Sequence, residues 1–371
     1  MTDVLLLGAG KIGRTIATLL TRSGDYRLRI GDVSQAALTR IEQQVDAETV
    51  LINADDPDSL ASALEGASAV ISALSYRQNP AVARAALASG ASYFDLTEDV
   101  ATTRVVRELA HKAGAGQVFV PQCGLAPGFI SIAANDLAGW FDEPHSIQMR
   151  VGALPEFPTH ALKYDLTWST DGLINEYCNP CEAILDGRQI ELLPLEGLEE
   201  FSLDGVSYEA FNTSGGLGTL CDKFAGDGLR ELTYKTIRYP GHRNLMKFLL
   251  EDLRLRERRD MLRQILEFAV PITYQDVVIV FCNVTGLRKG AHVKKSMAIK
   301  LYPSVIEGEV WSAIQITTAS AMCALVDLWR NGKTPTTGFV RQEDIHLGEF
   351  LANRFGQVYA AADSTRTAVH P

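Results

Sequence analysis

The chain of 371 residues is long for one hydrophobic core, so we expect two domains. Its composition, with 46% hydrophobic and 22% charged residues, is typical of a globular protein and not of a disordered chain. The net charge of −10 argues against a nucleic-acid partner, and no apolar run reaches the roughly 18–20 residues that would cross a membrane.

The first elements of the chain form a nucleotide-binding pattern. An apolar strand over 4–7 precedes Gly8, Gly10 and Gly13, which open a helix, and a second strand covers 27–30. In a Gly-x-Gly-x-x-Gly turn the first glycine permits the tight turn and the second lets a pyrophosphate approach the backbone. The third lets the helix pack on the strand, and the helix N-terminus attracts the phosphates. The pattern therefore predicts a dinucleotide site.

Asp32 lies 19 residues after Gly13, at the end of the second strand. A carboxylate there accepts both ribose hydroxyls of NAD and repels the 2′-phosphate of NADP, so we predict NAD, with NADP as the alternative. The residues expected to contact the cofactor are Gly8, Ala9, Gly10, Lys11, Ile12, Gly13, Asp32, Val33, Ala54, Asp55, Leu74, Cys123 and Gly124. Capping of the next helix explains the neighbouring Asp56 and Asp58 equally well.

Strands and helices then alternate regularly, which predicts a parallel, doubly wound sheet. The expected strands are 49–54, 68–74, 92–96 and 117–121, and the expected helices are 57–66, 80–90 and 101–113. Ligands of such sheets bind at the carboxyl ends of the strands. Site candidates by position are therefore Ser75, Tyr76, Asp95, Thr97, Glu98 and Asp99. For Thr97 and Asp99, helix capping is the simpler explanation.

The pattern changes after residue 127, where long strands dominate and predict a separate α+β domain. A helix over 128–140 comes first, and one long helix over 243–268 interrupts the strands. The expected strands are 147–154, 162–169, 183–192, 199–211, 232–239, 277–285 and 292–302. An apolar helix and a loop after Gly332 follow near the end.

The strand over 232–239 has polar groups on both faces, with Lys235 and Tyr239 on one and Arg238 on the other. A strand that only built a core would keep one face apolar, so we expect the segment from Arg238 to His242 to hold a ligand. His242 begins a helix whose dipole would keep its imidazole neutral and available as a base. The alternatives are that Arg238 only pairs with an acid of the sheet and that His242 only caps the helix.

The remaining polar motifs carry less information. Cys178 and Cys181 form a Cys-x-x-Cys without a second pair, so we predict no metal site and leave their role open. The glycine-rich segment 212–220 reads as a substrate loop or a hairpin, and Cys123 as a packing residue beside the nicotinamide. Six scattered cysteines and a start without a cleavage pattern favour the cytoplasm.

Several ordered stretches resemble the saccharopine dehydrogenase superfamily, and within it most closely the L-lysine 6-dehydrogenases. They are "GAGKIG", "YFDLTED", "CGLAPGF", "LKYDLTWSTDGLINEY", "FNTSGGLGTL", "YKTIRYPGH" and "TTAS…GF". The resemblance implies an NAD(P)-dependent enzyme acting at a C–N bond, with a Rossmann domain over 1–127. It also implies an α+β substrate and dimerisation domain over 128–318, a segment 319–371 that rejoins the Rossmann domain, and a homodimer.

Oxidation of an amine requires acids near the nitrogen and a cation near the substrate carboxylate. We expect Asp95, Glu98 and His242 to be catalytic. The residues expected to bind the substrate are Ser75, Tyr76, Asp171, Thr213, Arg238 and Tyr239, with Arg238 holding the carboxylate. Saccharopine reductases have an arginine where this chain has Asp171, which favours a smaller or more cationic substrate.

The favoured reaction is oxidation of L-lysine to 2-aminoadipate 6-semialdehyde. A saccharopine or carboxynorspermidine dehydrogenase, which condenses an aldehyde with an amine, is the nearest alternative. A non-catalytic protein that senses dinucleotides is an alternative of another class, since one fold supports many functions.

Overall fold

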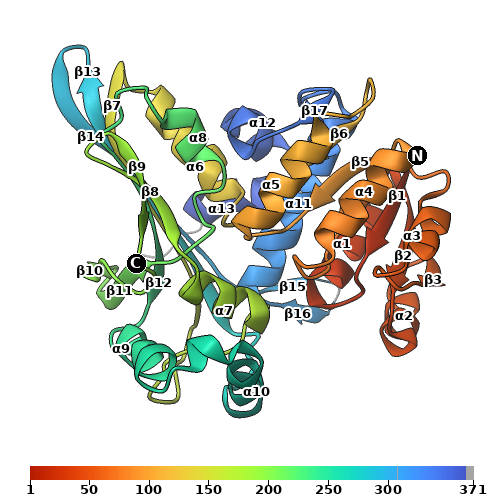
Figure 1. Cartoon of the computed structure of the whole chain (residues 1–371), viewed down its shortest axis with the longest axis horizontal. Coiled ribbons are helices and arrows are strands. Elements are labelled where there is room, and N and C mark those ends of the chain that lie inside the picture. Colours follow the sequence, from red (N-terminus) through yellow and green to blue (C-terminus); the bar gives the residue numbers. More distant parts are fainter. Residues whose placement is uncertain (307, 365–371) are drawn as a thin grey trace. The chain divides into compact units, whose positions relative to one another are not determined.

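The computed structural model describes residues 1–306 and 308–364, which form two compact units (Figure 1). The first unit contains Met1–Phe129 and Thr317–Ala361, and the second contains Ile130–Ile316. The sequence analysis places the borders after residues 127 and 318 instead. We describe each unit by itself.

The first unit is built on a seven-stranded sheet in the order β17-β6-β5-β4-β1-β2-β3. Every neighbouring pair is parallel, which confirms the predicted doubly wound sheet. Its strands are β1 Thr2–Leu7, β2 Tyr26–Asp32, β3 Glu48–Leu51, β4 Ala69–Ser72, β5 Ser92–Asp95, β6 Val118–Val120 and β17 Gly338–Phe339.

Helices connect these strands as the alternation predicts, with three additions. They are α1 Lys11–Arg22, α2 Gln35–Glu42, α3 Pro57–Leu64, α4 Asn79–Ser89 and α5 Val100–Ala110, followed near the end by α11 Ala313–Arg330, α12 Leu347–Ala352 and α13 Gln357–Ser364. The sequence analysis did not predict α12, α13 or α2, of which α2 lies between two predicted strands. This helix is short and buries only Ala37, Leu38 and Ile41, so its apolar pattern is weak.

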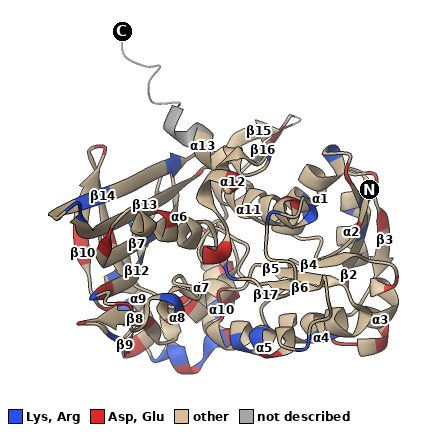
Figure 2. Cartoon of the chain, turned by 90° about the horizontal axis from the view of Figure 1, so that it is seen from above, with Lys and Arg blue, Asp and Glu red and all other residues tan. Residues whose placement is uncertain are grey.

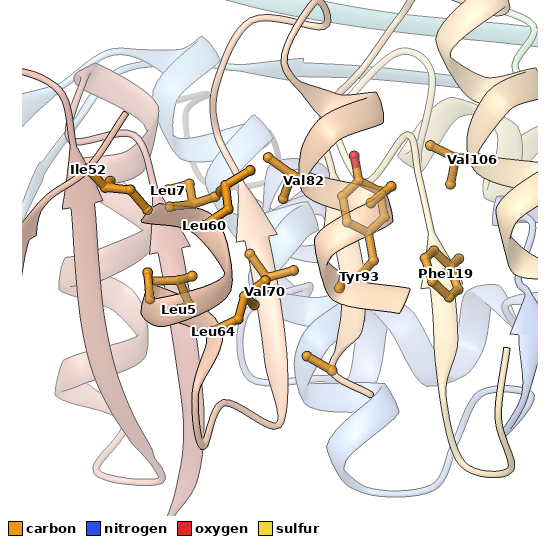
Figure 3. Packing of buried hydrophobic residues seen from close by; sticks show 14 of the residues in the cluster. Leu5, Leu7, Ile52, Leu60, Leu64, Val70, Val82, Tyr93, Val106 and Phe119 are labelled. Atoms are coloured by element: carbon orange, nitrogen blue, oxygen red, sulfur yellow. The ribbon is translucent and has the colours of Figure 1, made fainter. Parts of the chain in front are cut away.

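The core on one side of the sheet lies between the strands and helices α3 to α5 (Figure 3). Each of the central strands contributes alternate side chains to it, which are Leu5 and Leu7 from β1, Val70 from β4, Tyr93 from β5 and Phe119 from β6. The helices add Leu60, Leu64, Val82 and Val106. This burial fixes the carboxyl ends of the strands relative to one another and so positions the loops that follow them.

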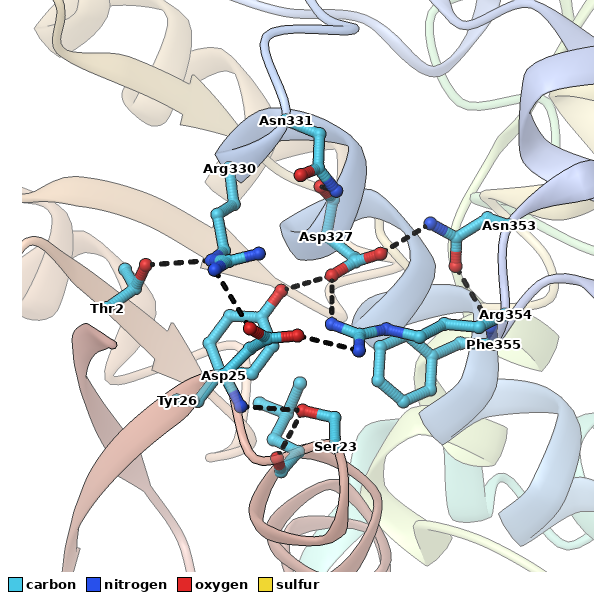
Figure 4. A network of polar contacts seen from close by, with 11 residues as sticks. Thr2, Ser23, Asp25, Tyr26, Asp327, Arg330, Asn331, Asn353, Arg354 and Phe355 are labelled. Atoms are coloured by element: carbon cyan, nitrogen blue, oxygen red, sulfur yellow. Dashed lines mark hydrogen bonds and ion pairs between the residues drawn. The ribbon is translucent and has the colours of Figure 1, made fainter.

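A polar network holds α11 against the turn before β2 (Figure 4). Asp327, only 3% exposed, accepts hydrogen bonds from the Tyr26 hydroxyl at 2.7 Å and from Arg354 at 2.6 Å. Asp25 pairs with Arg354 at 2.7 Å and with Arg330 at 3.0 Å. The last segment of the first unit is therefore held by ion pairs to the turn between α1 and β2.

The second unit is built on a mixed eight-stranded sheet with the main order β10-β11-β12-β7-β13-β14. Strands β12 and β7 are parallel and the other pairs are antiparallel, as an α+β fold allows. The strands are β7 Glu143–Pro155, β8 Cys181–Leu185, β9 Arg188–Leu192, β10 Glu199–Leu203, β11 Val206–Asn212, β12 Glu231–Arg238, β13 Asp276–Arg288 and β14 Ala291–Leu301. A separate pair joins β15 Ser304–Ile306 to β16 Glu309–Trp311.

Three predicted strands of this unit are wrong. The segments 183–192 and 199–211 are hairpins, because Asp186-Gly187 and Asp204-Gly205 adopt positive φ and turn the chain. The segment 162–169 forms a single bridge, between Leu166 and Ile272, and no strand.

The helices of the second unit also differ from the prediction. The predicted helix 243–268 is interrupted, since Arg254 takes a φ of 56° between α9 His242–Lys247 and α10 Arg259–Ala269. A π-helical turn and a 3-10 turn, Phe248–Asp252 and Leu255–Glu257, lie between them. The other helices are α6 Phe129–Gly139, α7 Thr170–Cys178 and α8 Leu220–Phe224, of which α7 and α8 were not predicted.

The network around Asp327 predicts a large stability effect. In Asp327→Ala the Tyr26 hydroxyl and Arg354 lose their acceptor, so the free energy of unfolding should fall by about 3 kcal/mol. Urea unfolding at neutral pH measures this change. The matched control is Asp3→Ala, which breaks the exposed Asp3–Arg27 pair and should leave stability almost unchanged. Equal effects of the two substitutions would contradict the role of the network.

Candidate functional site

Two of the three glycines in the turn after β1 are required by the protein's own packing, and the third is not. Gly8 has a φ of 100°, and a Cβ on Gly13 would lie 1.8 Å from the Gly8 carbonyl oxygen. Packing of α1 on β1 therefore requires both residues to be glycine. Gly10 has an extended backbone, and a Cβ there would meet no atom within 4 Å. The open space lies at the N-terminus of α1, where a pyrophosphate fits.

The Asp32 carboxylate is fixed beside this turn. Its Oδ2 accepts a hydrogen bond from the Ala9 N–H at 2.7 Å, and its Oδ1 accepts one from the Ser34 N–H at 2.8 Å. Val33, which follows, is 72% exposed. The structure thus brings together Ala9, Asp32 and Val33, and the ribose-binding role of Asp32 remains a prediction.

The other predicted cofactor contacts lie in loops at the same edge of the sheet. Leu74, after β4, lies 3.4 Å from the position of a Cβ on Gly8. Ala54 and the exposed Asp55 follow β3 in a turn that the Asn53 side chain stabilises by accepting the Asp55 N–H. Asp56 caps α3, so the capping explanation is confirmed for this residue.

Cys123 does not fit the predicted contact with the nicotinamide. Its side chain is fully buried, and the thiol lies 3.0 Å from the Val120 carbonyl oxygen and 3.8 Å from Nε2 of Gln342. Burial raises the pKa of the thiol well above its usual value. The burial of the thiol supports the packing interpretation over a nucleophilic role and argues against a side-chain contact of Cys123 with the cofactor. Gly124 is buried too and forms a bridge with Gly128.

The surroundings of Asp95 argue against its predicted catalytic role as well. The residue ends β5 with no exposed surface, and its Oδ2 accepts the Tyr93 hydroxyl at 2.6 Å. Its Oδ1 accepts the N–H groups of Thr97 and Gln122, both at 2.9 Å. Burial raises the pKa of this carboxyl, against the effect of its three donors. Asp95 therefore connects β5 to the loop after β6, and no oxygen of it faces a substrate amine.

The remaining candidates of the first unit follow β4 and β5. Glu98 is half-buried in the loop before α5, and its catalytic role remains a prediction. Asp99 caps α5 by accepting the Thr102 N–H at 2.7 Å, and Thr97 accepts the Asp99 N–H at 3.1 Å. The capping explanation is thus confirmed for Asp99, whereas Thr97 bonds to the N-cap residue and does not cap the helix itself.

Ser75 and Tyr76 lie in the turn between β4 and α4. Ser75 is exposed and Tyr76 is half-buried. Because β4 and β5 are parallel neighbours in the sheet, this turn lies at the same edge as the loop that carries Glu98. Neither residue is contradicted as a site candidate.

Arg238, the last residue of β12, is a charged side chain that is buried in the second unit. Only 2% of it is exposed, its Nε donates to the Tyr177 hydroxyl at 2.9 Å, and its Nη1 donates to the Ile237 carbonyl at 2.8 Å. The guanidinium also lies over the ring of Tyr164, 4.9 Å from its centroid. In the described part of the chain no carboxylate forms an ion pair with Arg238, so the predicted alternative of an ion pair in the sheet is wrong.

His242 is neutral, but for another reason than the predicted helix dipole. It is fully buried, and burial, followed by the charge of Arg238, lowers its pKa to about 3. Nδ1 lies 2.9 Å from the Leu162 carbonyl oxygen, which can only accept, so Nδ1 carries the proton. Nε2 then accepts from the Tyr177 hydroxyl at 3.1 Å. Because this bond occupies its lone pair, the geometry argues against His242 as a general base.

His242 does not cap the helix either. Gly241 is the N-cap of α9, with a φ of 100°. The buried carboxylate of Glu209 accepts the N–H groups of Gly241 at 2.8 Å and Arg243 at 2.6 Å, and so satisfies the start of the helix. Glu209 on β11 therefore fixes the corner that follows Arg238.

Three further predicted substrate residues have structural partners. Tyr239 points to the face opposite Arg238, where its hydroxyl donates to the Pro155 carbonyl at 2.9 Å and its ring stacks on Tyr208. Because successive residues of a strand face opposite ways, the side chain of Tyr239 points away from Arg238, which argues against its predicted role in binding the substrate. Thr213 is buried, and its hydroxyl forms a hydrogen bond with the Thr236 hydroxyl at 2.6 Å. Asp171, in the first turn of α7, lies 3.8 Å from Arg263 of α10.

The sequence analysis missed the residues that surround Arg238. Tyr164, Glu176 and Tyr177 are all buried, and Glu176 acts electrostatically on Arg238. Two of them lie on α7, which is buried at nearly every position and so has no polar face for charged residues. A glutamate and a tyrosine in such a helix are a signal that could have indicated a buried polar site.

Among the residues described, no group of three metal-ligating side chains occurs, and Cys178 and Cys181 are buried free thiols. No described helix is both long and apolar enough to span a membrane. Acidic and basic residues are interspersed within each unit (Figure 2). The segment 212–220 is not a hairpin, since the chain leads from β11 into α8 and Gly216 packs against the ring of Tyr234, and its role as a substrate loop stays a prediction.

The two kinds of glycine in the turn predict opposite outcomes. Gly13→Ala forces a Cβ onto the Gly8 carbonyl and should lower the free energy of unfolding by at least about 2 kcal/mol. Gly10→Ala should leave stability unchanged but weaken dinucleotide binding by about tenfold or more, because its Cβ enters the phosphate space. Urea unfolding and titration with NAD and NADP measure both. Unchanged binding in Gly10→Ala would refute the phosphate site.

The buried imidazole predicts how stability depends on pH. In the unfolded chain histidine has a pKa near 6.5, so acid protonates the unfolded state and leaves His242 neutral in the folded state. This contribution is present above about pH 6.5 and is lost as the pH falls toward 3. Between pH 7 and 5 the wild type should lose about 2 kcal/mol more than His242→Asn in urea unfolding. Equal losses would show that His242 is protonated in the folded state.

Comparison with known proteins gives two matching family domains. The saccharopine dehydrogenase NADP binding domain matches residues 4–120, and the saccharopine dehydrogenase C-terminal domain matches residues 124–355. The mitochondrial alpha-aminoadipic semialdehyde synthase of Rattus norvegicus is 24% identical over 312 residues, which are 79% of this chain and 32% of that protein. The Mus musculus protein is 22% identical over 308 residues, with the same coverage. The chain thus spans about a third of the length of these curated relatives.

Solved structures agree in fold. A saccharopine dehydrogenase (L-Glu forming) from Saccharomyces cerevisiae aligns with a TM-score of 0.76 and 14% identity, covering 99% of this chain and 98% of that one. A DAP dehydrogenase from C. glutamicum aligns with a TM-score of 0.50 and 13% identity, covering 97% and 98%. At such identities the likeness shows the fold alone.

The two family domains together cover almost the whole of both units. The first of them is a dinucleotide-binding domain, and the open space at Gly10 fits that ligand, so the cofactor is a nicotinamide dinucleotide. The family is one of dehydrogenases that act on amino-acid substrates. The chain belongs to the saccharopine dehydrogenase family.

Proposed function

We propose that the chain is an NAD(P)-dependent oxidoreductase that acts on a C–N bond of an amino acid, with oxidation of L-lysine at its 6-amino group as the favoured reaction. The observation that supports it most is the buried guanidinium of Arg238, whose hydrogen-bond partners are the neutral Tyr177 hydroxyl and Ile237 carbonyl. Glu176 acts on it electrostatically, but among the described residues no carboxylate forms a direct ion pair with it. A buried guanidinium without a direct ion pair is costly, which makes it a favourable partner for an anionic group of a ligand.

The free donors of Arg238 suit a carboxylate. Its Nε and one N–H of Nη1 are used by Tyr177 and Ile237, and the other three N–H groups have no partner among the described residues. These belong to Nη1 and Nη2, the pair that holds both oxygens of a carboxylate in parallel. The α-carboxylate of an amino acid is such a group.

The first unit would hold the cofactor through the turn at Gly10, the N-terminus of α1 and Asp32. When bound, a nicotinamide dinucleotide supplies the chemistry of accepting or donating a hydride. Within the protein the amine must lose its proton first, because a lysine ammonium has a pKa of about 10.4 and the neutral form costs roughly 4–5 kcal/mol at pH 7. With Asp95 occupied by three donors, Glu98 is the carboxylate of the first unit that we propose for this step.

Overall, lysine, NAD⁺ and water would give 2-aminoadipate 6-semialdehyde, ammonium, NADH and a proton, and the aldehyde would then cyclise onto the α-amino group with loss of water. The reverse type of chemistry is the second candidate. A saccharopine or carboxynorspermidine dehydrogenase-type reduction is supported by the names of the relatives and of the yeast structure. Asp171 supports lysine, because saccharopine reductases have an arginine there. We also propose a homodimer and a cytoplasmic location.

Assays of the purified protein test the proposal. Reduced nicotinamide should appear with L-lysine and NAD, more slowly with NADP, and hardly with saccharopine. Consumption of NADH with an aldehyde and an amino acid, without lysine oxidation, would instead assign the reductive condensation. Turnover with neither pair, together with tight NADH binding, would overturn both and indicate a dinucleotide sensor.

Arg238→Met tests the carboxylate site directly. It removes the charge and retains most of the volume, so KM for L-lysine should rise about 100-fold while KM for NAD stays the same. Cadaverine, which is lysine without its carboxylate, should be oxidised equally by both proteins. The control Arg243→Met changes an arginine that pairs with Glu196 and should leave both KM values unchanged. An unchanged KM for lysine in Arg238→Met would disprove the carboxylate role.

A further inference from the structure

We propose that Tyr177 is a positioning residue that holds the Arg238 guanidinium in the orientation in which it binds the substrate carboxylate. The inference rests on the proposed function, because it gives Tyr177 a role only if Arg238 binds that carboxylate. Its basis is a continuous chain of hydrogen bonds through four groups, in which each proton has one possible place.

The chain begins at the Leu162 carbonyl, which accepts from Nδ1 of His242 at 2.9 Å. Nε2 of His242 therefore has no proton and accepts the hydroxyl proton of Tyr177 at 3.1 Å. The hydroxyl oxygen of Tyr177 then offers only lone pairs, and it accepts from Nε of Arg238 at 2.9 Å. A reversed direction is excluded, because an arginine cannot accept and a carbonyl cannot donate.

Packing fixes this chain in place. Tyr177 is fully buried on α7, and its ring makes edge contacts with Phe211 and His242 at centroid distances of 5.7 and 5.9 Å. Burial raises the pKa of its hydroxyl, so the proton stays on the oxygen at every ordinary pH. The low pKa of His242 likewise keeps Nε2 an acceptor. Both groups thus retain their roles over the working range of an enzyme.

The consequence for Arg238 is a fixed guanidinium plane. With Nε held by Tyr177 and one N–H of Nη1 held by Ile237, rotation about the last side-chain bonds would break both contacts. The Nη edge is the part left for a carboxylate. Removal of the Tyr177 hydroxyl would leave the charge and its volume unchanged but would free the plane to rotate, which weakens a bidentate contact.

Tyr177→Phe removes this one oxygen. KM for L-lysine should rise about tenfold, the usual cost of one hydrogen bond to a charged group, while kcat and KM for NAD change little. In Arg238→Met the same change should have no added effect, so the double variant should match Arg238→Met. Tyr239→Phe is the control, because it removes a hydroxyl from the neighbouring residue on the opposite face and should leave KM unchanged.

The outcomes separate the two proposals. If Arg238→Met raises KM but Tyr177→Phe does not, or if the two effects multiply in the double variant, the role of Tyr177 is overturned and the proposed function stands. If Arg238→Met leaves KM unchanged, the carboxylate site is wrong and this inference falls with it.

Nitrogen NMR of histidine-labelled protein gives a readout that needs no turnover. The Nε2 signal of His242, assigned by its loss in His242→Asn, should be that of an unprotonated acceptor. It should shift toward the position of a nitrogen without a hydrogen bond in Tyr177→Phe, and stay in place in Tyr239→Phe. A protonated Nε2 in the wild type, or no shift in Tyr177→Phe, would refute the chain of hydrogen bonds.

Discussion

The close approach of α1 to β1 is the constraint on which the cofactor site depends. A Cβ on Gly13 would overlap the Gly8 carbonyl, so the helix can start where it does only because both residues lack side chains. This start aims the first-turn N–H groups along the carboxyl edge of the sheet. Asp32 is then brought against Ala9 by the parallel pairing of β1 with β2. The positions that we propose for the phosphates and the ribose are therefore two results of one packing contact.

The second unit depends on an opposite kind of constraint, a charge kept away from water. Arg238 is stabilised by two aromatic rings, a phenol oxygen and its own backbone, which together are weaker than a carboxylate. Glu209 adds rigidity by holding the start of α9 at the next corner. The protein thus orders this region without a direct ion pair to Arg238 among the described residues, which is compatible with the proposed carboxylate site.

The sequence allowed the first unit to be predicted nearly element by element, because periodic apolar runs and fixed glycines determine a parallel sheet. The prediction failed where a stretch read as one strand contained a turn, as at Asp186-Gly187. It also failed where a helix is buried on nearly all sides and therefore has no amphipathic pattern, as in α7. Asp95 and Cys123 were predicted to be site residues because they lie at strand ends. The position at a strand end does not determine whether a side chain is buried, and both are. Tyr239 was a different error, since the alternation of the strand already put it opposite Arg238. The burial that sets the state of His242 involves residues 162 and 177, far away in the sequence.

The first unit is made of two separate stretches of the chain, and this has a consequence for folding during synthesis. Strand β17 completes the edge of the sheet beside β6, and Arg354 closes the charges around Asp25, yet both come after the whole of the second unit. On the ribosome the N-terminal strands must therefore wait, with β6 as an unpaired edge, until about 210 further residues (130–339) have emerged. The stretch 130–316 of the second unit is continuous in the chain and is free to fold during this interval.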